Sequence, residues 1–149
     1  MAFAADPDFK DYTVTPVFTG THPALVPQEN SSPVMDQARA QALKGKVNFA
    51  GHYIVHQFGC GGGAICAEVL DARTGEVVGG LPNAYDGSTF AMAYQPDSRL
   101  IFITGIALDG EVDAQGNSLE SVNRDRYYEF VNNEFRLLTM TDTDSPPFE

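Results

Sequence analysis

Two histidines and two cysteines stand close together in the sequence and carry side chains that can do chemistry: His52, His56, Cys60 and Cys66. A zinc site would need its ligands about 2.0–2.3 Å from one point. Residues four apart on one strand lie about 13 Å apart, so we expect no metal here and imidazoles that are satisfied within a sheet. A cysteine protease-like site with His56 as base would need a free, activated thiolate. We expect a disulfide instead, and no enzyme.

The two cysteines flank a run of glycines. Residues 52–59 and 64–71 read as apolar strands, because Val, Ile, Tyr and Phe suit a buried pleated surface. Gly61, Gly62 and Gly63 permit the positive φ angles of a reversal. A hairpin that places Cys60 opposite Cys66 brings their Cα atoms within bridging range, and such a bridge persists in oxidising compartments.

Oxygen-bearing side chains in the loop 109–120 imitate the spacing of an EF-hand. Asp109, Glu111, Asp113, Gln115, Asn117 and Glu120 fall at relative positions 1, 3, 5, 7, 9 and 12. Position 6 is Ala114 instead of glycine, and no flanking helices are predicted. A calcium site built on Asp109, Glu111, Asp113 and Glu120 is therefore an alternative to an acidic, solvated loop.

The loop 82–89 has the composition of a contact surface. Tyr85 offers contact area at low entropic cost, and tyrosine is frequent at binding hot spots. Asp86, Gly87 and Ser88 form a small turn whose carboxylate and hydroxyl could enter a narrow cleft, with Thr89 beside them. The other interpretation of this loop is a plain connector.

The elements that must position these residues are mainly strands. Further strands are predicted at 12–18, 76–78, 88–94, 100–106, 126–131 and 134–140, and Asn132-Asn133 suits the two-residue turn of the last hairpin. One helix is predicted from Pro33 to Gly45, with Ser32 as its N-cap. Its apolar stripe is Val34, Ala38, Ala42 and Leu43, and its exposed face carries Asp36, Gln37, Arg39 and Gln41.

These elements predict a mainly β fold. Residues 70–77 and 93–102 resemble the hairpins of β-propeller blades, but the chain is shorter than a four-bladed ring at roughly 40 residues per blade. We expect two or three antiparallel, blade-like (propeller-like) sheets packed together, with one short helix. Residues 1–149 would form a single domain, with a flexible leader at 1–11 and a flexible tail at 142–149.

The charge and the N-terminus bear on partners and location. The net charge is −11, with 9 basic and 20 acidic residues, which disfavours nucleic acid and favours a basic protein partner. No apolar run reaches the length of a membrane span, so we expect no membrane association. Ala2 and Ala4 match the small-x-small end of a cleaved signal peptide. We therefore expect an exported, periplasmic protein, the alternative being a chance alanine cluster.

Residues 47–66 and 70–77 resemble a group of small exported proteobacterial proteins. The shared features are an Asn-Phe-Ala-Gly-His-Tyr opening at 48–53, a Gly-Cys-Gly turn at 59–61 and an Asp-Ala-x-Thr-Gly turn at 71–75. In its size, acidity and β content, the chain is similar to the periplasmic immunity proteins that inhibit type VI secretion peptidoglycan amidase effectors.

This resemblance implies a non-catalytic inhibitor without a cofactor. Such a protein forms a one-to-one complex with its cognate amidase and occludes a cleft that holds a cysteine nucleophile and a histidine base. Ser88 is then expected to meet the catalytic histidine, with Tyr85, Asp86, Gly87 and Thr89 beside it, and with Asp109, Glu111 and Asp113 as a second contact. The alternative is a small exported ligand- or calcium-binding β module without catalysis.

Overall fold

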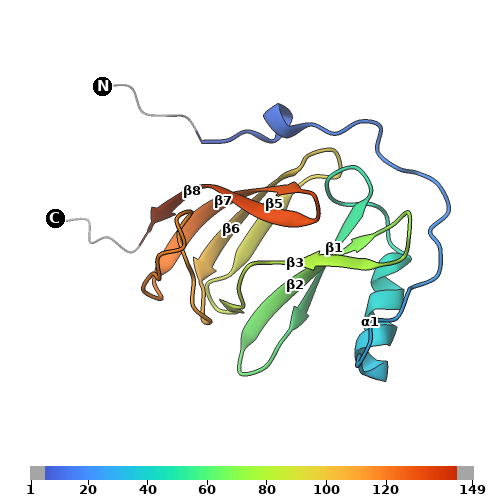
Figure 1. The fold of residues 1–149 in the computed structure, drawn as a ribbon, viewed down its shortest axis with the longest axis horizontal. Coiled ribbons are helices and arrows are strands. Elements are labelled where there is room, and N and C mark those ends of the chain that lie inside the picture. Colours follow the sequence, from blue (N-terminus) through green and yellow to red (C-terminus); the bar gives the residue numbers. More distant parts are fainter. Residues whose placement is uncertain (1–5, 144–149) are drawn as a thin grey trace.

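The computed structural model describes residues 6–143. It contains two four-stranded antiparallel sheets and, within these residues, one α-helix (Figure 1). The predicted mainly β architecture of packed antiparallel sheets with one short helix is confirmed. None of the described helices combines the length and the apolar composition that crossing a membrane requires.

The first sheet holds the hairpin that carries the cysteines. Its strands are β1 (Tyr53–Gly59), β2 (Ala64–Asp71), β3 (Val77–Gly80) and β4 (Tyr85–Asp86). β2 is the central strand: it pairs with β1 along one edge, and with β3 and then β4 along the other. The short β4 therefore lies beside the start of β2, next to the turn of the hairpin.

The second sheet is a four-stranded meander in sequence order. It is formed by β5 (Ala91–Tyr94), β6 (Leu100–Ile106), β7 (Asn123–Val131) and β8 (Glu134–Asp142). Asn132 and Asn133 close its last hairpin with φ angles of 53° and 63°, as their tolerance of the left-handed conformation predicts. The predicted strand 100–106 is an inner strand of this sheet, and Leu100, Ile101 and Ile103 are each 0% exposed.

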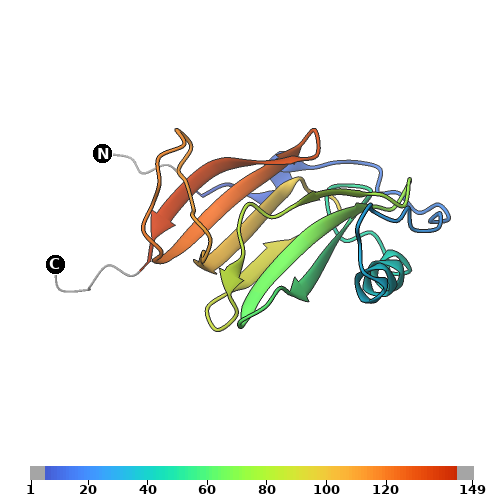
Figure 2. The same cartoon turned by 60° about the horizontal axis from the view of Figure 1, so that its bottom comes forward.

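The main core lies between the two sheets, which face one another in both ribbon views (Figures 1 and 2). Phe49 and Tyr85 are 0% exposed there, and Val69 is 1% exposed. Alternation along β2 sends Val69 into this core, while its neighbours Glu68 and Leu70 face the other side. A smaller cluster of Leu43, Val47, Ile54, Leu70 and Ala72 fills that other side, beneath the helix.

The helix α1 (Pro33–Leu43) begins at the predicted cap, where the Ser32 hydroxyl accepts a hydrogen bond from Met35 N at 3.1 Å. Its orientation differs from the predicted one. Val34 is 78% exposed, whereas Arg39 is only 8% exposed. The predicted apolar stripe was therefore wrong at Val34, and the predicted solvated face was wrong at Arg39, because an ion pair with the sheet fixes the rotation of the helix.

The segment before the helix is not the predicted strand 12–18. A 3₁₀-helix (Phe9–Tyr12) is followed by residues 14–28, called here the strap, which have no helix or strand. Val14 N donates to Asp97 O, Phe18 N to Gly51 O and Val26 N to Gly75 O. Because these three acceptors lie in separate loops, the segment has no single strand with which to form a ladder.

The predicted ends of the domain are described only in part. Ser98 Oγ donates to Phe9 O at 2.8 Å, which ties the second half of the predicted leader to the second sheet. Residues 1–5, which include the expected signal-peptide remnant, lie outside the described residues, as do residues 144–149 of the predicted tail. Strand β8 continues to Asp142, two residues beyond the predicted end.

Candidate functional site

The end of the β1–β2 hairpin is closed by the predicted disulfide. Cys60 and Cys66 are bonded, with their Cα atoms 5.8 Å apart. The prediction placed the two cysteines directly opposite one another. In the strand register Cys66 is paired with Phe58, so the two cysteines are diagonal neighbours instead. The reason is that the chain reverses tightly: Cys60 N donates to Ala64 O at 3.0 Å, which makes Ala64 the partner of Cys60.

A second turn lies against this hairpin. Strand β4 pairs with the start of β2, and Gly87 N donates to Gly63 O at 2.9 Å. A Cβ atom at position 87 would lie 2.7 Å from Gly63 O, so this contact requires glycine. We call the two turns together, residues 61–63 and 86–89, the tip surface.

The tip surface presents a carboxylate and a hydroxyl that are bonded to one another. Asp86 Oδ1 accepts hydrogen bonds from Ser88 N at 3.0 Å and from Ser88 Oγ at 2.8 Å. These bonds hold the pKa of the Asp86 carboxyl below its ordinary value. Gly87 and Ser88 are exposed, so the predicted turn is accessible to a partner.

Tyr85, predicted as a contact residue, is instead buried. Its side chain is 0% exposed, its ring stacks on Phe90 with centroids 5.2 Å apart, and the Arg126 guanidinium lies 5.1 Å from the ring centroid. Burial raises the pKa of the Tyr85 phenol far above its ordinary value. Tyr85 therefore anchors the tip surface from below and does not face a partner.

The acidic loop does not gather its carboxylates. Glu111 is 2% exposed and bonds to Arg126 and Arg124 beneath the loop, so its side chain does not lie on the surface as a partner contact would. Asp109 Oδ1 accepts a hydrogen bond from Asn83 Nδ2 at 2.9 Å. The Asp109 carboxylate is therefore held toward the segment before β4. Within the described residues, no group of three or more His, Cys, Asp or Glu side chains is placed to hold a metal ion.

Asp113 closes a turn of its own. Its Oδ1 accepts from Gln115 N and Asn117 N, each at 2.9 Å, and the bond from Asn117 N is the main cause that lowers its carboxyl pKa. Asp109 is exposed and Asp113 half-buried, while the fourth calcium candidate, Glu120, is exposed. Between and beside them, Leu108 and Val112 are 49% and 48% exposed. Their exposure is not evident from the sequence, because nothing there distinguishes these two apolar side chains from core residues.

His56 of β1 and His52, the residue before this strand, are both hydrogen-bonded within the first sheet, as predicted. The Nδ1 atom of His52 lies 3.0 Å from Asp71 Oδ1, and that of His56 lies 3.0 Å from Glu68 Oε2. Cys60 and Cys66 are bonded to one another, so neither supplies the free thiol that a cysteine nucleophile needs. His56 therefore supports the carboxylate that holds α1 on the sheet, whereas His52 braces the turn after β2 through Asp71 and Arg73.

No protein-family model, curated protein or solved structure matches the chain. The exposed features with organised chemistry are then the tip surface and the adjoining residues 108–113. Both are built from turns that end strands, and both lie on the side of β4.

Proposed function

We propose that the protein is an exported inhibitor that occludes the active-site cleft of a secreted peptidoglycan amidase with a cysteine nucleophile and a histidine base. The protein performs no catalysis and forms a one-to-one complex in the periplasm. The resemblance of residues 47–66 and 70–77 to the small exported proteins supports the class of partner. The Cys60–Cys66 disulfide is compatible with an oxidising compartment. The observation that carries the binding mode is the exposed Ser88 hydroxyl, held 2.8 Å from Asp86 on a turn bonded to the closed hairpin.

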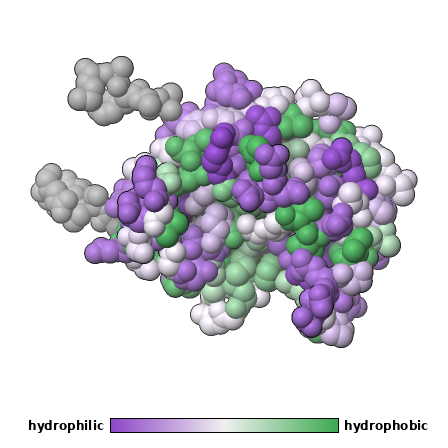
Figure 3. All heavy atoms as spheres, viewed as in Figure 1, coloured by the Kyte–Doolittle hydropathy of each residue, from purple (hydrophilic) through white to green (hydrophobic). Residues whose placement is uncertain are grey.

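The tip surface has the shape and the support that entry into a cleft requires. Figure 3 shows the end of the β1–β2 hairpin protruding at the bottom of a largely hydrophilic face. The neighbouring turn is fixed on one side by buried Tyr85 and on the other by Thr89, whose Oγ1 accepts from Ile106 N at 3.1 Å. A loop that is already fixed loses less conformational entropy when it binds.

Ser88 has the hydrogen-bonding capacity that blocks a catalytic histidine. Its hydroxyl donates its one hydrogen to Asp86, so its lone pairs remain available to accept. The N–H group of a protonated imidazole can donate a hydrogen bond to this hydroxyl oxygen. Such a bond would occupy the nitrogen that exchanges the proton with the catalytic cysteine. The lowered pKa of Asp86 keeps a negative charge behind Ser88, which favours the protonated imidazole.

The residues 108–113 supply a second contact. Leu108 N donates to Ala84 O at 2.8 Å, so this segment runs beside β4 and adjoins the tip surface. Leu108 and Val112 add the apolar area that the polar turn lacks, and Asp109 adds charge at the edge. The net charge of −11 favours a basic rim on the amidase, because complementary charges accelerate association.

Capture of the partner tests this function directly. The tagged protein is incubated with lysate from type VI-competent cells, and the eluate is assayed for peptidoglycan hydrolysis before and after the tagged protein is removed. We expect an amidase that is silent in the complex and active after separation. An eluate without amidase activity after separation, at high concentration of the tagged protein, would contradict the function.

A pair of variants that each lose an exposed hydroxyl then tests the binding mode. Ser88→Ala removes the acceptor, and we expect affinity for the amidase to fall by about tenfold or more, since hydrogen bonds to charged groups contribute about 1.5–3 kcal/mol. Thr15→Ala is the control for the loss of an exposed hydroxyl, because Thr15 lies in the strap, outside both the tip surface and residues 108–113. Equal affinities of the two variants would place the contact elsewhere on the protein while leaving the inhibitor function intact.

A further inference from the structure

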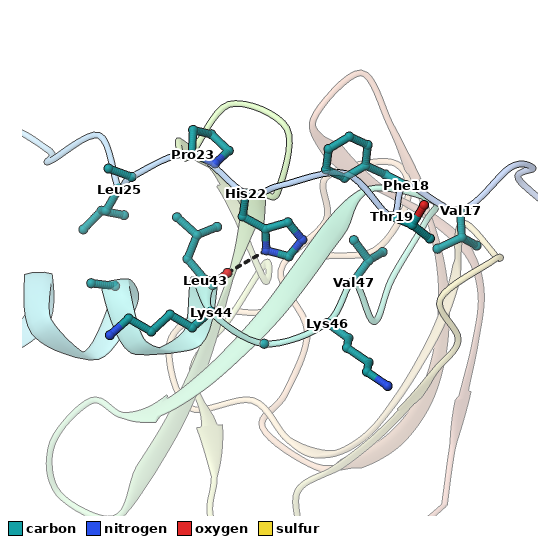
Figure 4. Close-up of a pocket in the computed structure, with 13 residues that line it drawn as sticks. Val17, Phe18, Thr19, His22, Pro23, Leu25, Leu43, Lys44, Lys46 and Val47 are labelled. Atoms are coloured by element: carbon teal, nitrogen blue, oxygen red, sulfur yellow. Dashed lines mark hydrogen bonds between the residues drawn. The ribbon is translucent and has the colours of Figure 1, made fainter.

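A groove lies on the helix side of the first sheet, between the strap and the C-terminal end of α1 (Figure 4). Its volume is about 870 Å³. Its apolar lining comes from three segments that are distant in sequence: Val17, Phe18 and Leu25 from the strap, Leu43 from α1, and Val47 from the segment after it. Sites for small molecules are typically concave and mostly apolar, with volumes of about 300–1,000 Å³.

One polar ring stands among these apolar side chains. His22 Nδ1 lies 2.7 Å from Leu43 O, and because a carbonyl oxygen only accepts, Nδ1 carries the hydrogen. Within the described residues, the structure gives Nε2 no hydrogen-bond partner. In Figure 4 this second nitrogen points away from the Leu43 carbonyl and toward the side of the groove formed by Val47. The groove thus contains one fixed polar group that is free to bond a ligand.

The charge at the groove is opposite to that of the rest of the molecule. Of the 9 basic residues in the chain, Lys10 and all six arginines form ion pairs. Within the part of the chain that the structure describes, Lys44 and Lys46 have no ion pair, and both line the groove. None of the acidic residues between positions 6 and 143 lines it. An unneutralised cationic edge therefore adjoins the apolar groove.

The end of the helix accounts for only one of these lysines. Lys44 is the C-cap of α1, where the helix dipole favours a positive charge. Lys46 lies two residues further on and has no such role. In Figure 4 the two side chains leave the lower edge of the groove in opposite directions, Lys44 along α1 and Lys46 away from it. This arrangement suits a ligand with an apolar body and an anionic head.

We propose that this groove binds a single-chain anionic amphiphile, with its alkyl chain on Phe18, Leu43 and Val47 and its head group at the cationic edge that carries Lys44 and Lys46. Fatty acids and lysophospholipids share this chemistry, through a carboxylate or a phosphate head. The groove is formed by the strap and α1, whereas the tip surface is formed by the ends of β1, β2 and β4 (Figure 1). The ligand site is therefore a second site, beyond the proposed inhibitor function.

Calorimetric titration of the whole protein tests the site. The ligands are laurate, lauroyl lysophosphatidylglycerol and uncharged glycerol monolaurate, each below its micelle concentration. We expect saturable one-to-one binding of at least one anion, with the monolaurate about tenfold weaker. The preferred anion identifies the source of the head group. Absence of saturable binding by both anions would overturn the proposal.

Lysine variants test the head-group contact. Lys44→Gln combined with Lys46→Gln should weaken binding of the anion by about tenfold, as expected for the loss of charge-assisted bonds, and leave binding of the monolaurate unchanged. Lys10→Gln is the control, because Lys10 is an exposed lysine remote from the groove. Equal anion affinities of the double variant and this control would overturn the role of the lysines.

A groove-filling variant tests the location of the alkyl chain. Ala40 lines the groove, so Ala40→Trp should abolish binding of all three ligands, whereas Gln37→Trp on the exposed side of α1 should not. Thermal unfolding shows whether either tryptophan variant folds. If Ala40→Trp does not fold, the exposed lysine variants test the site in its place. Retained binding in folded Ala40→Trp would place the ligand elsewhere. None of these changes touches the tip surface, so this proposal and the inhibitor function can fail separately.

Discussion

Arg39 of α1 and Glu68 of β2 form a bidentate ion pair that fixes the helix on the first sheet. Arg39 Nε lies 2.9 Å from Glu68 Oε2, and Nη2 lies 2.9 Å from Oε1. The two side chains are only 9% and 8% exposed, and His56 adds a bond to the same carboxylate. The position of α1, and with it the wall of the groove, therefore depends on one buried pair.

Arg39→Ala should destabilise the protein strongly. It leaves Glu68 buried without its cationic partner, and breaking such a pair from one side costs about 3–5 kcal/mol. Urea unfolding measures the change in the free energy of unfolding. Gln37→Ala, on the exposed face of the same helix, is the control and should change it by less than about 0.5 kcal/mol. Similar values for both variants would show that the pair adds no net stability.

Tyr85→Phe should leave binding of the amidase unchanged and stabilise the fold. The Tyr85 hydroxyl is buried and has no hydrogen-bond partner among the described residues, and an unsatisfied buried group costs about 1–3 kcal/mol. The stacking on Phe90 and the contact with Arg126 persist with a phenylalanine ring. Urea unfolding should show a gain of about 1 kcal/mol. A loss of stability, or a loss of affinity, would contradict the anchoring role assigned to Tyr85.

The stability of the protein should fall at alkaline pH because of Tyr128. Burial raises the pKa of this phenol from 10.0 to about 12, so the folded state favours the neutral form. The associated stability is complete below pH 10 and is lost as the pH rises from 10.0 to about 12. At about 1.4 kcal/mol per pKa unit, the loss is about 3 kcal/mol.

Urea unfolding between pH 9 and 12, with phenolate absorbance recorded in parallel, measures this loss. Tyr128→Phe should reduce the pH dependence of the free energy of unfolding. Tyr12→Phe in the 3₁₀-helix should leave this pH dependence unchanged. Tyr85, whose phenol pKa is also raised by burial, acts in the same direction and leaves some dependence in the Tyr128 variant. A free energy of unfolding that is constant over this range in the unmodified protein would contradict the burial of these phenols.

Removal of the disulfide should weaken both the fold and the tip surface. In the variant with Cys60→Ser and Cys66→Ser, the free energy of unfolding should fall by about 2 kcal/mol, because the bridge closes only a short ring. Affinity for the amidase should fall as well, since Gly63 supports the turn that carries Ser88. Addition of reductant should lower the melting temperature of the unmodified protein and have no effect on the variant. Unchanged affinity in the variant would show that the hairpin does not preorganise the tip.

Local signals in the sequence determined most of the elements. The glycines after Cys60, the cap at Ser32 and the pair Asn132-Asn133 each restrict the backbone within a few residues, and all three features form as predicted. Alternation and β-branched composition placed the two long hairpins for the same reason. The predicted strand at 12–18 failed although its composition suits a strand, because its pairing stops at a single bridge between Thr13 and Ser98 and the next bonds reach other loops.

Only the tertiary structure decided which polar side chains are buried. Arg39 and Glu68 are 29 positions apart, and Glu111 and Arg126 are 15 apart, so neither pair produces a local pattern. Tyr85 is of a residue type that is frequent at contact surfaces, yet the second sheet covers it. The sequence by itself therefore determined the long strands, their turns, the helix cap and the disulfide, because short-range sterics control them. The buried ion pairs, the exposed Ser88 and the groove at Lys44 and Lys46 depend on contacts between distant segments, which only the packed chain defines.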